Sequence, residues 1–564
     1  MMNAQQLFVT NLLRKTELFN DTQIAMLLSA DLSDEQGLTG AVVRLEMAKA
    51  DVFLRKLAEV LNLDYIDLSQ IRPTDEALQL LPARAVYQYN ALPIAVEEGI
   101  LKVALSDPFN TAAADGIRLA SGKPVRILLA PYVEIDKAIK KFYGVGAEAI
   151  EKMIEDGRYA VSDSEANISK IDVNEMGQEA SIVRFVNQII AEADRQGATD
   201  IHFEPMEMEL RIRYRIDGML HKVDVPPQLN RLKAAIISRL KVMANLDIAE
   251  KRLPMDGRIG IRIGSEDIDI RVSTCPTAYG ESVSLRLLQK SGNFVQLKDL
   301  GMSERDFTLT QKLIARPNGI ILVTGPTGSG KSTSLYAFLH EINKINVRIM
   351  TAEDPIEYEM AGINQVLVRS DIGLTFARAL RAFLRQDPDI IMVGEIRDGE
   401  TAEIAINASL TGHLVFSTLH TNDAAGAFAR LIDMGAEPFL VASAVAGVLA
   451  QRLARRLCPK CRAQQPLKQG WWDQVGAPPQ DFVYEPVGCD ACVHTGYKGR
   501  GAIFELLNVN EQVGSLIIGR RSSTEIRHAA IAEGMSTLRQ DGWRKVFNGF
   551  TSVEELMRVT EDAK

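Results

Sequence analysis

Residues 325–332 have the sequence Gly-Pro-Thr-Gly-Ser-Gly-Lys-Ser, a complete Gly-x-x-x-x-Gly-Lys-Ser phosphate-binding loop. The apolar residues 320–323, which end one residue before it, predict a buried strand, and residues 334–342 after it predict a helix. The glycines allow backbone N–H groups to surround the α- and β-phosphates, and the helix N-terminus adds positive partial charge. We expect Lys331 to reach the β- and γ-phosphates and Ser332 to bind Mg²⁺. The sequence therefore predicts a site for a nucleoside triphosphate.

Length and composition narrow the class of protein. At 564 residues the chain is too long for one hydrophobic core, and we expect roughly three to five domains. No apolar run approaches the ~18 residues of a membrane span; the best candidate, Phe439 to Ala450, predicts a buried helix. The N-terminus lacks the pattern of a signal peptide, so we expect a cytoplasmic protein. A net charge of −9 without a basic block argues against a helicase or DNA translocase.

The first 145 residues predict a separate module. Residues 45–61 indicate a helix, and residues 92–96 and 100–105 indicate two strands that turn at Glu97-Glu98-Gly99. From residue 144 to 179 the chain becomes acidic and poor in aromatic residues. Such a composition buries little surface, so we expect a linker there.

Arginines alternate with apolar residues between residues 180 and 290. In residues 210–216 the period of two places Arg211, Arg213 and Arg215 on one face of a strand, and Asp217-Gly218 predicts a hairpin turn. A second pair of strands, at 258–263 and 268–272, repeats the pattern with Arg258 and Arg262. One interpretation is a half-exposed sheet whose wet face is cationic. The other is a surface that meets phosphates, including those bound to a neighbouring subunit.

Carboxylates follow two strand-like runs beyond the phosphate loop. A short strand ends in Glu353, Asp354 and Glu357, and a second, apolar strand leads to Glu395. Ligands of open α/β sheets lie beyond the carboxyl ends of the strands, where these acids should gather. A carboxylate there can hold a water on Mg²⁺ or align the attacking water. A solvated loop position is the alternative for Glu353 and Asp354.

Two of the seven histidines, His413 and His420, bracket the next apolar run. Because they are seven positions apart, a continuous strand would point them to opposite faces. His420, at the C-terminal end, is better placed to sense the γ-phosphate. We expect His413 to be structural or to lie at an interface, and ordinary packing is the alternative for both.

Four of the five cysteines form two Cys-x-x-Cys pairs, Cys458 with Cys461 and Cys489 with Cys492, separated by 27 residues. Each pair can bind one side of a tetrahedral Zn²⁺, and soft thiolates disfavour Mg²⁺ or Ca²⁺. Four thiolates leave no open position for catalysis, so we expect a structural zinc lobe; two reduced pairs without metal are the alternative. Cys275 is expected to be a small core residue.

Together these segments resemble the GspE/PilB family of secretion ATPases, the hexameric motors of type II secretion and type IV pilus assembly. The resemblance rests on the phosphate loop, the histidine and cysteine clusters, and four further stretches. These are Gly-Ala-Thr-Asp-Ile-His-Phe-Glu-Pro at 197–205, residues 241–258, the acidic box at 353–358, and Val-Gly-Glu-Ile-Arg-Asp at 393–398. The resemblance runs from about residue 180 to the end, whereas the first 145 residues match only loosely.

The resemblance implies an α/β multidomain fold centred on a RecA-like P-loop ATPase domain. The implied parts are an N-terminal α/β module that docks a partner (1–145), an acidic linker (146–179), a PAS-like α+β domain (180–297), the RecA-like domain (298–456), a four-cysteine zinc lobe (457–502) and a C-terminal helical region (503–564).

The resemblance also assigns roles to residues. Lys331 and Ser332 match the Walker A motif, Glu395 the Walker B glutamate and Glu357 the acidic-box glutamate, and the general base stays open between the two glutamates. Only the resemblance places arginines at a subunit interface. The implied catalytic residues are Lys331, Glu357, Glu395, His420, Arg213 and Arg271. The implied nucleotide-binding residues are Gly325, Pro326, Thr327, Gly328, Ser329, Gly330, Lys331, Ser332, Thr333, Glu353, Asp354 and His413. Ser332 and Glu395 would hold Mg²⁺.

These observations predict an ATP-hydrolysing homo-hexamer, with ATP, Mg²⁺ and Zn²⁺ as ligands, that powers pseudopilus assembly for type II secretion. Stretches such as 269–274 and 551–560 favour the secretion branch over the alternative, a PilB-like pilus extension ATPase. A nucleic-acid translocase is the rival class, but no basic groove with interleaved aromatic residues is evident.

Expected partners are an inner-membrane platform and cytoplasmic docking proteins, through which the protein would associate peripherally with the inner membrane. Some relatives carry cyclic-di-GMP motifs that begin with Arg-Leu-Gly. This tripeptide does not occur before residue 145, which argues against nucleotide sensing by the N-terminal module.

Overall fold

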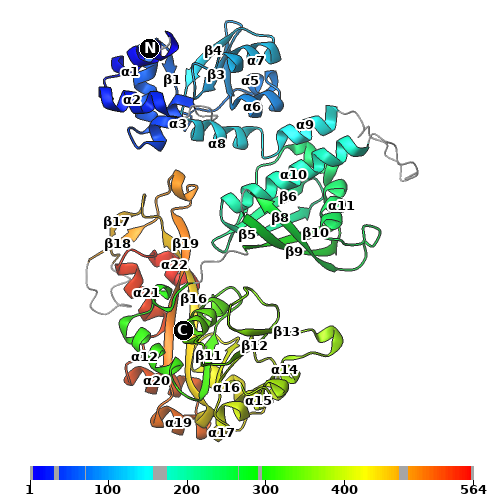
Figure 1. Cartoon of the computed structure of the whole chain (residues 1–564), viewed down its shortest axis with the longest axis vertical. Coiled ribbons are helices and arrows are strands. Elements are labelled where there is room, and N and C mark those ends of the chain that lie inside the picture. Colours follow the sequence, from blue (N-terminus) through cyan, green and yellow to red (C-terminus); the bar gives the residue numbers. More distant parts are fainter. Residues whose placement is uncertain are drawn as a thin grey trace. The chain divides into compact units, whose positions relative to one another are not determined.

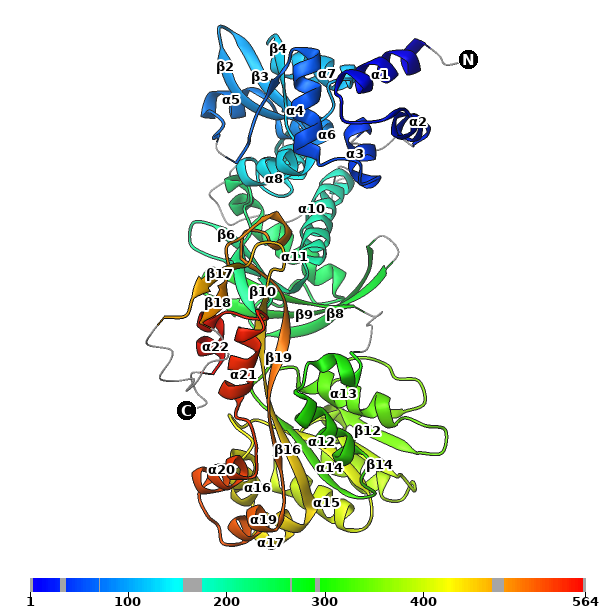
Figure 2. The same cartoon turned by 90° about the vertical axis from the view of Figure 1, so that its left-hand side faces the viewer.

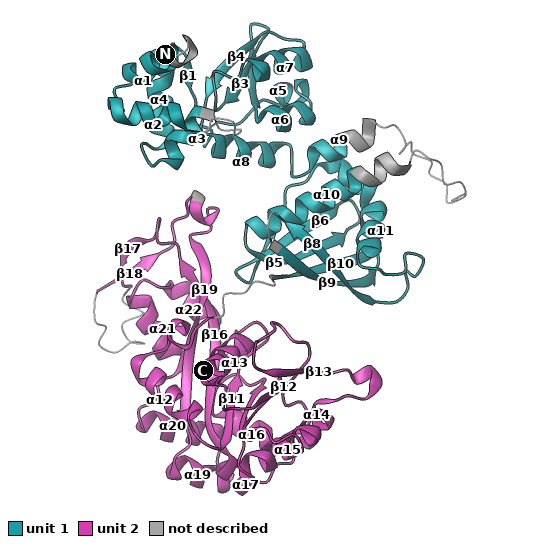
Figure 3. Ribbon diagram, in the orientation of Figure 1, with its two compact units in different colours: residues 1–288 teal, residues 289–564 magenta. Residues whose placement is uncertain are grey.

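The computed structural model describes residues 4–30, 37–69, 71–155, 175–263, 266–289, 295–468 and 481–560. The chain divides into two compact units, residues 1–288 and 289–564 (Figure 3). The first unit contains a four-stranded and a six-stranded sheet, and the second contains a seven-stranded and a two-stranded sheet (Figure 1).

The N-terminal module is built on the four-stranded sheet, in the order β1-β4-β3-β2. β2 and β3 form the predicted hairpin, and Glu98 and Gly99 in its turn have φ angles of 50° and 79°, as a type I′ turn requires. The helix predicted at 45–61 begins only at Ala50. The strands are β1 (Asp64–Tyr65), β2 (Leu92–Glu97), β3 (Ile100–Leu105) and β4 (Val125–Leu129). The helices are α1 (Ala4–Lys15), α2 (Asp21–Ser29), α3 (Gly37–Arg44), α4 (Ala50–Leu61), α5 (Asp75–Leu80), α6 (Ala83–Tyr89), α7 (Thr111–Ser121) and α8 (Tyr132–Phe142).

The linker expected at 146–179 is wrong at both of its ends, where residues 147–155 and 175–179 are helical. α9 (Ala147–Glu155) is a helix that packs against α10 (Glu175–Arg195), and Ala149 and Ile150 are buried in the same hydrophobic cluster as α10. The linker was predicted from the acidic composition, although the apolar residues of this segment are spaced for one face of a helix. Residues 156–174, the remainder of the predicted linker before α10, lie outside the described part of the chain.

The six-stranded sheet is antiparallel where its pairings are described, in the order β7-β6-β5-β10-β9-β8. α10 and α11 pack on its apolar face through side chains such as Phe185, Ile189 and Ile236. The strands are β5 (Ala198–Pro205), β6 (Leu210–Ile216), β7 (Met219–Lys222), β8 (Met255–Ile263), β9 (Glu266–Thr277) and β10 (Gly280–Gln289). η1 (Pro227–Leu232) leads into α11 (Lys233–Met243).

The predicted alternation in β6 is confirmed. Ile212 and Tyr214 are buried in the core, while the arginines between them lie on the opposite, polar face. The same period in β9 buries Val272 and Thr274 and leaves Cys275 exposed. Our expectation of a core position for Cys275 is therefore wrong, because the residue occupies an outward position of the strand.

The seven-stranded sheet has the order β13-β12-β14-β15-β11-β16-β19, and its first six strands are parallel. Only β19 is antiparallel, and it runs beside β16 over the length of both strands (Figure 2). The strands are β11 (Gly319–Thr324), β12 (Ile349–Glu353), β13 (Asn364–Leu367), β14 (Ile390–Val393), β15 (Leu414–Leu419), β16 (Val445–Leu457) and β19 (Tyr497–Asn508).

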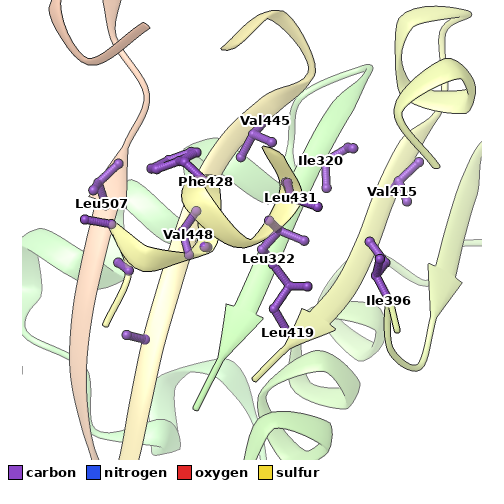
Figure 4. Close-up of a cluster of buried hydrophobic side chains, with 14 of the residues drawn as sticks. Ile320, Leu322, Ile396, Val415, Leu419, Phe428, Leu431, Val445, Val448 and Leu507 are labelled. Carbon is purple, nitrogen blue, oxygen red and sulfur yellow. The ribbon is translucent and has the colours of Figure 1, made fainter. Parts of the chain in front are cut away.

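Helices cover both faces of this sheet, as the alternation of β11 shows. Ile320 and Leu322 belong to a cluster that includes Phe428 of α16 (Figure 4), whereas Ile321 and Val323 pack with α13 on the other face. The helices are α12 (Glu304–Ile314), α13 (Lys331–Ile342), α14 (Phe376–Phe383), α15 (Gly399–Leu410), α16 (Gly426–Asp433), α17 (Pro438–Ala444), α19 (Glu511–Ile518), α20 (Ser523–Ala532), α21 (Leu538–Phe547) and α22 (Val553–Val559). Short 3₁₀ turns are η2 (Leu297–Leu300), η3 (Ser370–Ile372) and η4 (Asp490–Cys492).

Two expectations for this unit are wrong. The run Phe439 to Ala450 is not one helix, because α17 ends at Ala444 and residues 445–450 begin β16. A strand buried on both faces has the same continuous apolar pattern as a buried helix. Likewise, residues 503–508, expected to be helical, complete β19. The main sheet thus takes its last strand from beyond the cysteine-containing segment, where β17 (Ala463–Pro466) pairs with β18 (Phe482–Glu485). Within the described residues, no helix combines the length and apolarity needed to cross a membrane.

Candidate active site and metal centre

The phosphate loop connects β11 to α13, as its flanking sequence predicts. Gly325, Gly328 and Gly330 have φ angles of 148°, 76° and 88°. A Cβ on Gly325 would lie 2.5 Å from the carbonyl oxygen of Gln451, and one on Gly330 would lie 2.7 Å from the Gln451 side-chain nitrogen. Glycine is therefore required at both positions by backbone conformation, and at Gly325 also by the close approach of the β16 backbone.

Lys331 is the first residue of α13 and folds back over the loop. Its Nζ donates hydrogen bonds to the carbonyl oxygens of Gly325 (2.9 Å) and Pro326 (3.1 Å). Burial lowers the pKa of Lys331; the nearby Glu395 carboxylate opposes this shift and the Arg452 guanidinium adds to it. The lysine is thus held where the loop amides and the N-terminus of α13 converge. Ser332 and Thr333 follow it as exposed residues of the first helical turn.

Glu395 and His420 lie at the same edge of the sheet as the phosphate loop. They follow β14 and β15, and β15 pairs in parallel with both β14 and β11. His420 Nε2 is 3.4 Å from Glu395 Oε2, and Arg397 also forms an ion pair with Glu395. The hydrogen bond and charge of Glu395 raise the pKa of Arg397, with a smaller contribution from Asp354. The structure therefore brings the predicted Glu395 and His420 to one place.

Glu353 ends β12 and is nearly fully buried. It accepts hydrogen bonds from the hydroxyls of Tyr336 and Thr351 (2.6 Å for Thr351) and from Nε2 of Gln365 (3.0 Å). These hydrogen bonds connect β12 to α13 and β13. Glu353 therefore fixes the buried side of the acidic box at 353–358. Its neighbour Asp354 is exposed, which leaves that carboxylate accessible to solvent.

His413 is not part of this cluster. It precedes β15, at the amino edge of the sheet, whereas the phosphate loop and His420 lie at the carboxyl edge. His413 Nδ1 is 2.8 Å from the carbonyl oxygen of Ala408, and its own carbonyl accepts from the N–H of Gly319. This position agrees with the structural alternative, and the assignment of His413 to the nucleotide-binding residues stays a prediction.

Two residues near the loop were missed by sequence reasoning. Gln451 Oε1 accepts from the hydroxyl of Ser334 at 2.7 Å, and the buried Arg452 donates to the carbonyl oxygen of Asn422 at 2.9 Å. Both residues come from β16, the strand that we expected to be a helix up to Ala450. Their signal was a polar pair within an otherwise apolar run, which is costly unless both side chains have partners.

The polar face of the six-stranded sheet gathers the predicted arginines, together with two acids that we had not assigned. Glu204 of β5 accepts from Arg211 at 3.0 Å and from Arg213 at 2.8 Å. Asp200 is 3.1 Å from Arg286 and 3.7 Å from Arg215. Arg271 lies on the same face, opposite the buried Ile270 and Val272, and is paired across the strands with Arg258. Arg213 and Arg271 belong to the first unit, whereas the phosphate loop belongs to the second. A contact between these arginines and a nucleotide on the loop therefore stays a prediction.

The four paired cysteines come together as one cluster. The Sγ atoms of Cys458, Cys461, Cys489 and Cys492 all lie within 4.8 Å of one another. Backbone N–H groups of Cys489 and Gly496 lie 3.2 Å from the sulfur of Cys492. Four convergent thiols with N–H donors around them fit a tetrahedral Zn²⁺.

A phosphate loop at the carboxyl edge of a largely parallel sheet, with a lysine, a carboxylate and a histidine beside it, defines a P-loop nucleoside triphosphatase. The chain belongs to the family of type II/IV secretion system proteins, whose sequence model matches residues 175–558. Residues 61–149 match the MshEN domain, a more definite assignment than the loose resemblance of this module had suggested.

Comparison with individual proteins agrees with this assignment. Type II secretion system protein E of Pectobacterium carotovorum is 53% identical over 392 residues, 69% of this chain and 78% of that protein. The type IV pilus assembly ATPase PilB of Myxococcus xanthus is 44% identical over 517 residues, 90% and 91% of the two chains. The solved ATPase DotB of Yersinia pseudotuberculosis aligns with a TM-score of 0.50 and 20% identity over 71% of this chain and 96% of its own, which supports the fold alone. The prediction of a secretion and pilus-assembly ATPase is confirmed.

Proposed function

We propose that this ATPase powers pseudopilus assembly for type II protein secretion from the cytoplasmic face of the inner membrane. The phosphate loop with Glu395 and His420 at one sheet edge carries the hydrolytic part of the proposal. The secretion branch is supported by the 53% identity to the Pectobacterium protein. The 44% identity to a pilus assembly ATPase, over more of the chain, favours pilus extension as the second candidate.

The side chains suit hydrolysis by positioning and charge neutralisation. The loop amides and Lys331 would hold the phosphates, and His420 would lie near the γ-phosphate. Ser332 and Glu395 would hold Mg²⁺, which when bound neutralises charge on the phosphate oxygens. Either Glu395 or Glu357 would orient the attacking water. Arg213 and Arg271 would complete the site from a neighbouring subunit of a hexamer, and the four cysteines would hold a structural Zn²⁺.

The N-terminal module would dock the motor onto an inner-membrane platform or a cytoplasmic docking protein, and membrane association would be peripheral through these partners. The division of the chain at residues 288–289 leaves this module outside the ATPase unit. Removing residues 1–145 should therefore spare ATP turnover and abolish recruitment to membranes from cells that contain the secretion machinery. Unchanged recruitment of the truncated protein would contradict this part of the proposal.

The central test is Lys331→Ala. Because Lys331 is the cation held over the loop, we expect ATP turnover to fall by roughly 100-fold or more. Lys344→Ala is the matched control, since it removes an exposed lysine just beyond the other end of α13. Turnover is measured on the purified full-length protein, with thermal unfolding recorded to verify folding. Normal turnover in Lys331→Ala would overturn the assignment of the site.

A further inference from the structure

A buried carboxylate lies between the active-site edge and the C-terminal helices. Glu505 is on β19 and is 1% exposed. Its neighbours Ile503 and Leu507 belong to the hydrophobic cluster shown in Figure 4, and Glu505 projects from the same face of the strand. An ionised group in such surroundings is costly unless hydrogen bonds compensate. Burial accordingly raises the pKa of Glu505, while two backbone N–H donors oppose the shift.

Those donors come from two segments far apart in the sequence. Glu505 Oε1 accepts from the N–H of Ala424 at 2.9 Å, and Oε2 accepts from the N–H of Leu538 at 3.3 Å. Ala424 lies just before α16, and Leu538 is the first residue of α21. Amides at helix N-termini have no partner within their own helix. One carboxylate therefore satisfies the N–H of a residue just before α16 and the first N–H of α21.

Ala424 belongs to the segment that follows His420, residues 421–426, which we call the 421–426 loop. The Oγ1 of Thr421 lies 2.7 Å from that of Thr324, the last residue of β11 before the phosphate loop, and the Thr421 N–H donates to the Thr324 hydroxyl at 2.9 Å. Arg452 donates a hydrogen bond to the carbonyl oxygen of Asn422 in the same loop. The 421–426 loop is thus hydrogen-bonded both to Thr324, which directly precedes the phosphate loop, and to Glu505.

We propose that Glu505 is a positioning residue of the ATPase, which holds the 421–426 loop in register with the phosphate loop and couples it to the N-terminus of α21. A shift of the loop when nucleotide binds changes the hydrogen bond at Ala424, and the shared carboxylate carries that change to Leu538. Coupling of this kind is reciprocal, so a change in the hydrogen bond between Glu505 and the N–H of Leu538 affects the loop. The proposal rests on the phosphate loop being the nucleotide site.

The test compares two variants of the full-length protein. Glu505→Gln keeps the shape of the side chain but turns an amide NH₂ toward one of the two N–H groups. Thr537→Ala is the control, because it removes the side-chain cap of Gln540 N–H in α21 and leaves both hydrogen bonds of Glu505, to Ala424 and Leu538, in place. We expect Glu505→Gln to lower kcat by roughly tenfold with KM for ATP within about twofold, since misplaced catalytic groups slow the chemical step. Thr537→Ala should keep the wild-type kcat while losing thermal stability.

Hydrogen exchange of the wild-type protein provides a measurement that needs no variant. Adding a non-hydrolysable ATP analogue with Mg²⁺ should change exchange at residues 421–428 and 538–541 together, and Glu505→Gln should abolish the change at 538–541 only. Equal loss of kcat in Glu505→Gln and Thr537→Ala would overturn the proposal in favour of a merely structural role. So would an α21 response that survives in Glu505→Gln. No exchange response at the phosphate loop itself would instead contradict the nucleotide site.

Discussion

Val493 adopts a backbone conformation that β-branched residues rarely occupy. It follows Cys492 with a φ of 49°, and the next residue, His494, has a φ of 58°. This left-handed turn directs the N–H of His494 to the carbonyl oxygen of Cys489 at 2.9 Å and completes the second cysteine knuckle. Val493 is 56% exposed, so the packing of its side chain offsets little of the backbone strain.

Val493→Gly should therefore stabilise the cysteine lobe. Removing the Cβ relieves about 1–2 kcal/mol of left-handed strain, whereas the added freedom of glycine in the unfolded chain costs about 0.5–1 kcal/mol. We expect a net gain of roughly 0.5–1 kcal/mol, measured as a higher midpoint for thermal unfolding of the cysteine lobe. Val487→Gly is the matched control, because Val487 is similarly exposed on the same lobe but has no positive φ. Equal midpoints for the two variants would refute the strain argument.

At the scale of elements, Glu204 on β5 determines how the arginine face responds to pH. Burial alone raises the pKa of Glu204, but the hydrogen bonds from Arg213 and Arg211 outweigh it and lower the pKa below the usual 4.5. A carboxyl group with a lowered pKa in the folded state contributes its stability above the unfolded pKa, and this contribution is lost as the pH falls through the folded pKa. Glu204 should thus stabilise the sheet at neutral pH and cease to do so in acid.

Glu204→Gln tests this directly. We expect the variant to lose about 1 kcal/mol of sheet stability at pH 7, a small value because solvent screens this partly exposed cluster. The difference from wild type should shrink below the unfolded pKa and vanish once the wild-type carboxyl is protonated. The readout is hydrogen exchange of the β5 and β6 amides in the full-length protein. Glu209→Gln removes a more exposed partner, of Lys222, and should change little at any pH. A difference that does not depend on pH would contradict the ion-pair explanation.

The elements also show what sequence can and cannot predict here. The phosphate loop, Glu395 and His420 were predictable, because each follows an apolar strand directly and parallel strands share one carboxyl edge. The arginine face of β6 was also predictable, because the alternation of arginines with apolar residues lies within a single strand. β16 was not, because a strand buried on both faces has no alternation to distinguish it from a helix. α9 was hidden by its acidic residues.

The remaining site residues depend on contacts between distant segments. Arg452 and Glu505 form hydrogen bonds with Asn422 and Ala424, which lie on a loop from another part of the sheet. Nothing in the neighbourhood of either residue along the chain indicates this partner. A polar residue inside an apolar strand signals only that some partner must exist. Its identity follows from the sheet order, in which β19 joins from beyond the cysteine lobe.

At the scale of the whole molecule, the two units divide the proposed catalytic set. Lys331, Glu395 and His420 belong to residues 289–564, and Arg213 and Arg271 belong to residues 1–288. If the arginines serve the nucleotide of a neighbouring subunit, a subunit lacking Lys331 can still supply its arginine, and a subunit lacking Arg271 can still supply its lysine. Mixed oligomers therefore distinguish action within a subunit from action between subunits.

We expect Lys331→Ala and Arg271→Ala to be inactive separately and to complement each other when coexpressed in equal amounts with different tags. Half of the subunits retain the lysine and half of their neighbours retain the arginine, so about one quarter of the sites should be complete in a closed ring. ATP turnover of doubly purified oligomers should then approach one quarter of the wild-type rate. Arg258→Ala, which removes the neighbouring arginine on the same face, is the control and should be active by itself. No recovery in the mixture would place Arg271 at its own subunit's nucleotide, and full turnover by Arg271→Ala alone would remove the arginine face from catalysis.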